Sequence, residues 1–143
     1  MSVEPGRVSC YTFAMADTML KPKLLLVEDD PFMMSLMADA FSRDGFTVVF
    51  ADNGEDAVKQ VLQEKPDIAV MDILLPKKNG IEAIRDIRAS PSGAHLPIVV
   101  VSNLEDASYI TDAQKLGVKA YLIKANVQIP EIVAKVKEVL WGK

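Results

Sequence analysis

The sequence predicts an α/β domain in which a doubly wound, five-stranded parallel sheet is covered by helices on both faces. Four short apolar blocks, bounded by polar or turn residues, have the length and continuous apolarity of strands that are buried on both faces. These blocks are residues 24–27, 68–71, 98–101 and 120–123. Between them the apolar residues recur with helical spacing. The resulting βα unit occurs five times, which favours a parallel sheet with right-handed crossovers.

The remaining strand and the helices follow from local signals. Residues 46–51 are β-branched and aromatic but less uniformly apolar, as an edge strand would be. A first helix is expected from about Pro31 to Arg43, because Asp30 supplies a capping side chain and proline suits the first helical turn. The other four helical stripes are expected to start near Asn53, Asn79, Leu104 and Pro130.

Size, composition and charge exclude several classes of protein. The chain has 143 residues and 15.7 kDa, which suits one domain with one full core. A net charge of −4, with lysines and arginines scattered, argues against a nucleic-acid surface and against a polybasic membrane anchor. No apolar run is long enough to cross a membrane. The single cysteine, Cys10, allows no internal disulfide, so we expect a reducing, cytoplasmic location.

The start of the chain differs from the rest. Residues 1–22 lack periodicity and contain no apolar segment of signal-peptide length. We expect a flexible N-terminal extension over 1–22 and a folded domain over 23–143, with no further output domain after the fifth helix.

Polar residues whose side chains can bind a ligand or take part in a reaction follow the predicted strands, at the points where these strands end. They are Glu28, Asp29 and Asp30 after the first, Asp72 after the third, Ser102 after the fourth and Lys124 after the fifth. In an open parallel sheet, ligands bind at the carboxyl ends of the strands. We therefore expect these side chains to converge at one edge.

Each of these residues alone has a simpler interpretation. An acidic run can cap the next helix, Asp72 can belong to a turn, Ser102 can cap a helix near Leu104, and Lys124 can be a solvated surface residue. Together they are harder to explain, because converging carboxylates repel one another without a counter-charge. Mg²⁺ with oxygen ligands suits such a site, and a hydroxyl and an ammonium could hold the remaining oxygens of a bound phosphoryl group.

From about Lys23 to Leu140 the chain resembles the receiver domain of bacterial two-component response regulators, of the stand-alone, single-domain type. The resemblance is carried by the Glu28-Asp29-Asp30 run, the 72–80 stretch Asp-Ile-Leu-Leu-Pro-Lys-Lys-Asn-Gly, Ser102, and the 121–124 stretch Tyr-Leu-Ile-Lys, in order and at family spacing. It implies a flavodoxin-like strand order 2-1-3-4-5.

The resemblance also implies roles for these residues. Asp72 would be the phosphoacceptor, with Lys124 and Ser102 contacting the phosphoryl group, and Ser102 and Tyr121 forming the conformational switch. Mg²⁺ would be bound by Asp29, Asp72 and the backbone carbonyl of Leu74, with Glu28 or Asp30 acting directly or through water. The domain would catalyse its own aspartyl phosphorylation and dephosphorylation without being a conventional turnover enzyme.

Three positions depart from the usual receiver pattern. Ala125 follows the lysine where a proline in a cis peptide is common, so that a trans bond or a strained loop is possible. Asn103 replaces a small residue after the switch hydroxyl. Leu74 and Leu104 are apolar where polar residues can position a hydrolytic water, and we expect slow autodephosphorylation.

The resemblance implies partners and leaves alternatives open. A sensor histidine kinase or a histidine phosphotransfer protein would donate the phosphoryl group, and an unknown downstream protein or a phosphorylation-dependent homodimer would read it. The fourth helix, fifth strand and fifth helix are the expected surface for this. A phosphorylation-independent pseudo-receiver used for docking is the main alternative. An aspartyl phosphatase would need a second acid where this chain has Leu74, and a flavodoxin would need a hydroxyl-rich or glycine-rich phosphate loop where this chain has Glu28-Asp29-Asp30.

Overall fold

The computed structural model describes residues 21–142, which form a five-stranded parallel sheet. The strands are β1 (Lys23–Val27), β2 (Thr47–Ala51), β3 (Ile68–Met71), β4 (Ile98–Ser102) and β5 (Ala120–Ile123). Their hydrogen-bonded order is β2-β1-β3-β4-β5, and all four pairings are parallel. The expected order is therefore confirmed. Most of the expected extension, residues 1–20, lies outside the described residues.

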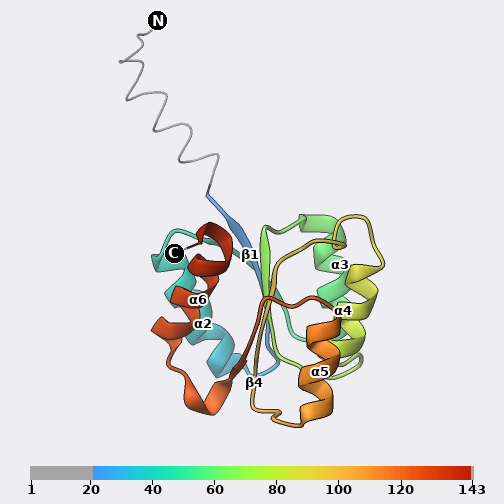
Figure 1. Cartoon of the computed structure of the whole chain (residues 1–143). Helices are drawn as coiled ribbons and strands as arrows, with labels where there is room; N and C mark the ends of the chain where they lie inside the picture. The colour runs from blue at the N-terminus through green and yellow to red at the C-terminus, as the bar shows by residue number, and fades with distance from the viewer. Residues whose placement is uncertain (1–20, 143) are drawn as a thin grey trace, which may run out of the picture.

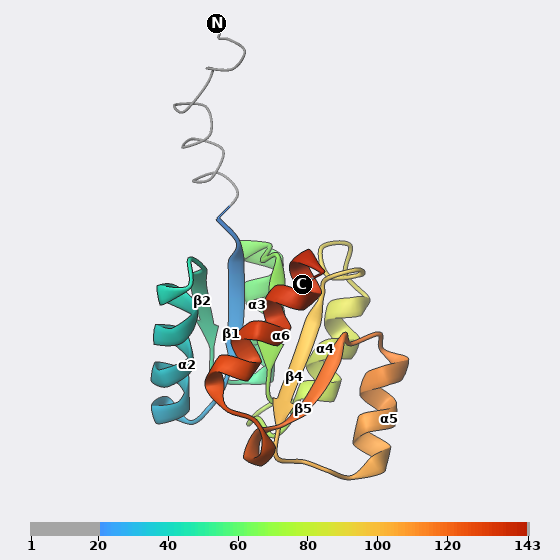
Figure 2. The same ribbon diagram turned by 60° about the vertical axis from the view of Figure 1, so that its left-hand side comes forward.

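Helices cover both faces of this sheet, as Figures 1 and 2 show. One face carries α2 (Pro31–Arg43) and α6 (Ile129–Trp141), and the other carries α3 (Gly54–Glu64), α4 (Gly80–Arg88) and α5 (Ala107–Lys115). A single turn of 3₁₀ helix, η1 (Lys124–Asn126), connects β5 to α6. The arrangement is that of a doubly wound sheet, with the site at the ends where the strands lead into the helices.

The core consists of two apolar layers, one on each side of the sheet. Leu24 and Leu26 of β1 pack in the layer under α2 and α6, together with Phe41. Leu25 and Val27 alternate with them and pack in the layer under α3 and α4. Because successive side chains of a strand point to opposite faces, a continuous apolar run places residues in both layers. The uniform apolarity of this strand thus has its expected physical cause.

The two edges of the sheet differ from the centre. The edge position expected for residues 46–51 is confirmed, since β2 pairs only with β1 and Phe50 is exposed. For residues 120–123, burial on both faces was the wrong expectation. β5 is the other edge strand, and all four of its residues are only partly buried. A short apolar run does not distinguish a central strand from an edge strand that one helix shields incompletely.

Capping side chains fix where the helices begin. Asp30 accepts a hydrogen bond from the Phe32 N–H at 2.9 Å, with proline in the first turn of α2 as predicted. Asn53 caps α3 from a buried position, and Asn79 forms a reciprocal capping box at the start of α4. The amino termini of three helices are therefore fixed by residues that precede them.

The start of α5 differs from the expectation. The helix begins at Ala107 rather than near Leu104, and Ser102 is the last residue of β4 instead of a helix cap. The carboxylate of Asp106 accepts hydrogen bonds from the backbone N–H and the hydroxyl of Ser108, at 2.9 and 2.7 Å, and so supplies the cap. Leu104 continues the apolar spacing of the helix because it packs against the same core layer from the preceding loop.

Among residues 21–142, no helix has both the length and the apolarity that crossing a bilayer requires.

Candidate functional site

The site lies where β1, β3 and β5 end, and each strand contributes a charged side chain to it. Glu28 follows β1, Asp72 follows β3 and Lys124 follows β5. The Lys124 ammonium nitrogen lies 2.9 Å from Glu28 Oε1 and 2.8 Å from Asp72 Oδ2. The structure thus brings together residues that are 96 and 52 positions apart in the chain. The parallel topology places these three residues at the same edge of the sheet.

The two carboxylates and the ammonium are largely withdrawn from water. Their side chains are 3% exposed for Glu28, 7% for Asp72 and 16% for Lys124. Ionised groups at such depth are stable only when they are paired and hydrogen bonded. Burial lowers the pKa of Lys124, but the hydrogen bonds and charges of Asp72 and Glu28 outweigh it, and the pKa is raised above its ordinary value. Lys124 is therefore a cation throughout the physiological range.

Backbone donors satisfy the second oxygen of each carboxylate. Asp72 Oδ1 accepts from the Leu74 N–H at 3.1 Å, and Glu28 Oε2 accepts from the Asp30 N–H at 3.2 Å. Gly80 lets α4 approach this strand end closely, because a Cβ there would lie 2.5 Å from the backbone oxygen of Asp72. The position of Asp72 is thus fixed by its strand, by its own loop and by the start of the next helix.

Three carboxylates lie close together at this edge of the sheet, and two of them are the partners of Lys124. Oxygens of Glu28, Asp29 and Asp72 lie within 4.8 Å of one another, and Asp29 is exposed whereas the other two are buried. One ammonium, that of Lys124, faces this group. Three carboxylates and one ammonium leave excess negative charge, which suits a hard divalent cation with oxygen ligands. Asp30 is not in the cluster, since its carboxylate caps α2.

Ser102 and Tyr121 are connected through the loop that follows β4. Ser102 is fully buried, and its hydroxyl accepts from the Leu104 N–H at 3.3 Å. The Tyr121 hydroxyl donates to the Leu104 carbonyl at 2.7 Å, and its ring packs on the core layer. Burial and the charges of Asp72 and Asp106 raise the pKa of Tyr121. The loop that follows the site hydroxyl is therefore bonded to the neighbouring strand.

One contact at this edge was not expected from the sequence. Asn103 Oδ1 accepts from the Ala125 N–H at 2.8 Å, so the two unusual residues that follow Ser102 and Lys124 bond to each other. The Lys124–Ala125 peptide is trans, as are all peptides described. An alanine keeps the N–H that a proline would lack, and an asparagine is long enough to accept from it. The presence of both Asn103 and Ala125, which depart from the usual receiver pattern, was the signal in the sequence that could have indicated this hydrogen bond.

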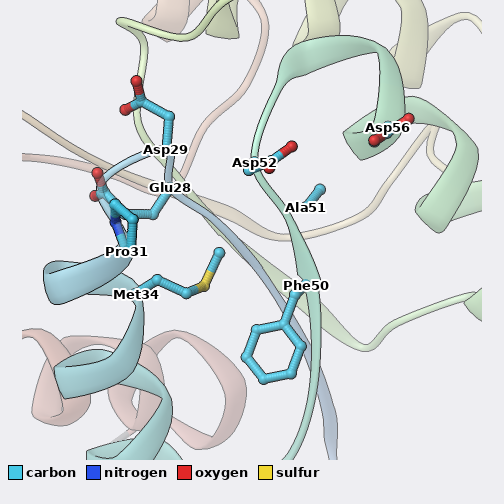
Figure 3. Close-up of a pocket in the computed structure, with 8 residues that line it drawn as sticks. All are labelled: Glu28, Asp29, Pro31, Met34, Phe50, Ala51, Asp52 and Asp56. Atoms are coloured by element: carbon cyan, nitrogen blue, oxygen red, sulfur yellow. The ribbon is translucent and has the colours of Figure 1, made fainter.

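A pocket of about 370 Å³ opens beside the acidic cluster (Figure 3). Its apolar lining includes Met34 of α2 and Phe50 of β2, which come from opposite sides. Asp52, directly after β2, and Asp56, in the first turn of α3, add carboxylates. Its lining residues include Glu28 and Asp29 but not Asp72 or Lys124, so it adjoins the ion-paired centre without enclosing it. The spacing of acidic residues in the sequence gave no sign of this pocket.

The site is thus an acidic group at the carboxyl edge of a doubly wound sheet, paired with a lysine that directly follows the last strand. Residues 24–137 match the family model of the response regulator receiver domain. The chain belongs to this family.

Individual relatives agree with this assignment. The chain is 35% identical over 103 residues to a chemotaxis protein CheY of Thermotoga maritima, covering 71% of this chain and 84% of that protein. It is 30% identical over 102 residues to the protein PilH of Pseudomonas aeruginosa, covering 71% of this chain and 84% of that protein. Both relatives are of single-domain size, like the described part of this chain.

A solved structure shows the same fold with a metal. The receiver domain of the sensor histidine kinase PA1611 from Pseudomonas aeruginosa has a magnesium ion coordinated in its active site cleft. It superimposes with a TM-score of 0.76 at 25% identity, covering 85% of this chain and 98% of that one. In the present chain, the acidic cluster of Glu28, Asp29 and Asp72 lies at the carboxyl edge of the sheet.

Proposed function

We propose that this receiver domain accepts a phosphoryl group on Asp72 in a Mg²⁺-dependent reaction and changes its conformation to control partner binding. The observation that carries the proposal is the position of the Lys124 ammonium, 2.8 Å from Asp72 Oδ2 in a largely buried site. A buried carboxylate held by a fixed cation is a suitable nucleophile for phosphoryl transfer, since the same cation can then pair with the incoming phosphoryl oxygens.

The donor would be a phosphohistidine on a sensor histidine kinase or a histidine phosphotransfer protein. An oxygen of Asp72 forms a bond to phosphorus while the bond between phosphorus and the imidazole nitrogen breaks. The electron pair of the broken bond returns to the imidazole, which takes a proton from solvent. The product is an acyl phosphate, and the domain supplies the catalysis through positioning and charge.

The acidic cluster fits Mg²⁺ by its donor set and by its excess charge. Asp29, Asp72 and the carbonyl of Leu74 would hold the ion, with Glu28 acting directly or through water and Asp30, whose carboxylate caps α2, through water only. The ion supplies charge neutralisation for the phosphoryl oxygens. Without it, the three carboxylates repel an incoming anion.

Ser102 and Tyr121 would carry the signal out of the site. A phosphoryl group on Asp72 offers new acceptors to the Ser102 hydroxyl, which at present accepts from Leu104. A movement of Ser102 would alter the loop to which the Tyr121 hydroxyl is bonded. The surface formed by α5, β5 and α6 would then bind an unknown downstream protein or a second copy of the chain.

The organisation of the chain is part of the same proposal. A receiver domain over residues 23–143 would follow an N-terminal extension over 1–22, act in the cytoplasm and bind no nucleic acid itself. Its activity would be limited to its own phosphorylation and dephosphorylation.

The test is intact-mass spectrometry after incubation with Mg²⁺ and phosphoramidate, a small phosphodonor. The wild type should gain the mass of one phosphoryl group, and Asp72→Asn or removal of Mg²⁺ should abolish the gain. Asp52→Asn is the matched control, because it removes an exposed carboxylate from the adjoining pocket and should leave the gain intact. No gain in the wild type, and no spectroscopic shift with beryllofluoride, would favour a phosphorylation-independent docking module.

Binding should then be measured with the same proteins. Capture of a target by wild type and by Asp72→Asn, each with and without beryllofluoride, should differ between the two proteins only when the phosphoryl mimic is present. Equal capture under all four conditions would exclude binding controlled by phosphorylation.

A further inference from the structure

A hydrogen bond outside the charged pair joins the two segments that carry Ser102 and Lys124. Asn103 Oδ1 accepts from the Ala125 N–H at 2.8 Å. Asn103 directly follows Ser102 at the end of β4, and Ala125 directly follows Lys124 at the start of η1. The bond therefore connects backbone neighbours of the site's hydroxyl and of its ammonium.

The loop after β4 is held firmly enough to act as a support. The Leu104 carbonyl accepts from the Tyr121 hydroxyl at 2.7 Å, and the Leu104 N–H donates to Ser102 Oγ at 3.3 Å. Leu104 also packs against the core layer under α3 and α4. Asn103 lies between Ser102 and Leu104, so its backbone is fixed on both sides.

The turn that carries Lys124 has less support of its own. The residue before η1, Ile123, supplies no capping side chain, and Ala125 and Asn126 are exposed. A lysine ammonium sits on a flexible four-carbon stem, and holding it against two carboxylates costs side-chain entropy. Fixing the peptide next to Lys124 reduces that cost, because fewer orientations of the stem are sampled.

We propose that Asn103 is a positioning residue for Lys124. Its amide holds the Lys124–Asn126 turn against the loop of Ser102, so that the ammonium stays over Asp72 and a movement of the loop changes the position of the lysine. The effect on phosphoryl transfer rests on the proposed function of Asp72; the effect on the unphosphorylated protein does not.

The first experiment uses the full chain without Mg²⁺ or phosphodonor. Amide hydrogen exchange at Ala125 and acetylation of Lys124 by a small acylating reagent are measured in the wild type and in Asn103→Leu, which lacks the acceptor. Both rates should rise about three- to tenfold, the range that corresponds to the net free energy of one hydrogen bond. Asn103→Asp keeps an acceptor at the same reach and should stay near the wild type.

Two further variants separate positioning from a general loss of structure. Asn126→Leu changes an exposed amide in the same turn and should leave both rates unchanged. Asn103→Ala repeats the loss of the acceptor with a smaller side chain, in case Asn103→Leu does not fold. If exchange at Ala125 rises while acetylation of Lys124 does not, or if neither rises, the proposal is overturned.

The second experiment measures the rate of Asp72 phosphorylation by phosphoramidate with saturating Mg²⁺. Asn103→Leu should be slower by about the same factor as the rise in Lys124 acetylation, and Asn103→Asp should be closer to the wild type. A wild type that is phosphorylated together with an unchanged Asn103→Leu refutes the positioning role alone. A wild type that is not phosphorylated, with Lys124 still released in Asn103→Leu, refutes the proposed function and leaves the positioning role supported.

Discussion

Replacing Lys124 by methionine tests the central ion pair, because methionine keeps much of the side-chain volume and removes the charge. In the wild type the ammonium bonds both Glu28 Oε1 and Asp72 Oδ2, whose side chains are 3% and 7% exposed. Removing one partner of a buried ion pair leaves its counter-charge buried and uncompensated, at a cost of roughly 3–5 kcal/mol. Since Lys124 is 16% exposed and water reaches the site, we expect the free energy of unfolding to fall by about 3 kcal/mol.

The assay is urea denaturation at neutral pH in the presence of a chelator. Lys135→Met is the matched control, because Lys135 pairs with Glu138 at 3.0 Å on the surface of α6, with side chains 36% and 55% exposed. Exposed pairs of this kind contribute roughly 0.2–1 kcal/mol. Addition of Mg²⁺ should reduce the deficit of Lys124→Met, since a cation bound by the cluster compensates the same carboxylates. Equal losses in the two variants would refute the reasoning.

The difference in free energy of unfolding between the wild type and Lys124→Met should depend on pH in one definite direction. The pKa of Lys124 is raised in the folded protein above its ordinary value of 10.5. The folded state therefore retains the proton more tightly than the unfolded chain does. The stabilisation by Lys124 should be complete below pH 10.5 and should be lost as the pH rises through the folded-state pKa. The gap between wild type and Lys124→Met should thus be constant near neutrality and narrow only in strong alkali.

Three other substitutions test the surroundings of the site. Tyr121→Phe removes the donor to the Leu104 carbonyl and should cost about 1 kcal/mol in urea denaturation, with faster amide exchange in the loop; unchanged exchange would contradict the bond. Gly54→Ala places a Cβ 1.9 Å from a backbone oxygen of the 73–79 loop and should cost about 2 kcal/mol or more by the same assay, whereas Glu55→Ala should have little effect. The acyl phosphate should decay over many minutes because Leu74 offers no polar group to a hydrolytic water, and Leu74→Glu should shorten its lifetime; decay of the wild type within seconds would contradict this.

The central part of the fold could be predicted from the sequence, because its signals are local. The apolar block before Glu28 is buried on both faces, as its uniform composition indicates, and Asp30 with Pro31 marks the first residue of α2. These features depend on neighbours in the chain, which the sequence displays directly. The burial of β5 could not be predicted in the same way. Whether an apolar run is central or at an edge depends on which strands pair with it, and that is a property of the whole sheet.

The site shows the same division between local and distant information. Convergence of carboxylates and a lysine followed from the rule that parallel strands place their carboxyl ends at one edge. The sequence did not show whether Glu28 or Asp30 joins Asp72 in the site. The answer depends on which of the two carboxylates caps α2. Sequence order gives three consecutive acids, residues 28–30, whereas the direction of each side chain depends on the helix that begins there. The Asp30 carboxylate caps α2, and the Glu28 carboxylate pairs with Lys124.

The charge balance of the site connects its stability with its proposed chemistry. Three carboxylates face one ammonium, and that ammonium is already shared between Glu28 and Asp72. The site is therefore stable enough to form in the described fold, yet it retains negative charge that favours a cation and disfavours a free anion. A phosphoryl group would have to enter with added positive charge present, and it would draw Lys124 away from at least one of its present partners. Contacts that hold the turn of Lys124 in place, such as the hydrogen bond from the Ala125 N–H to Asn103, therefore affect how readily the Lys124 ammonium exchanges its carboxylate partners for the phosphoryl group.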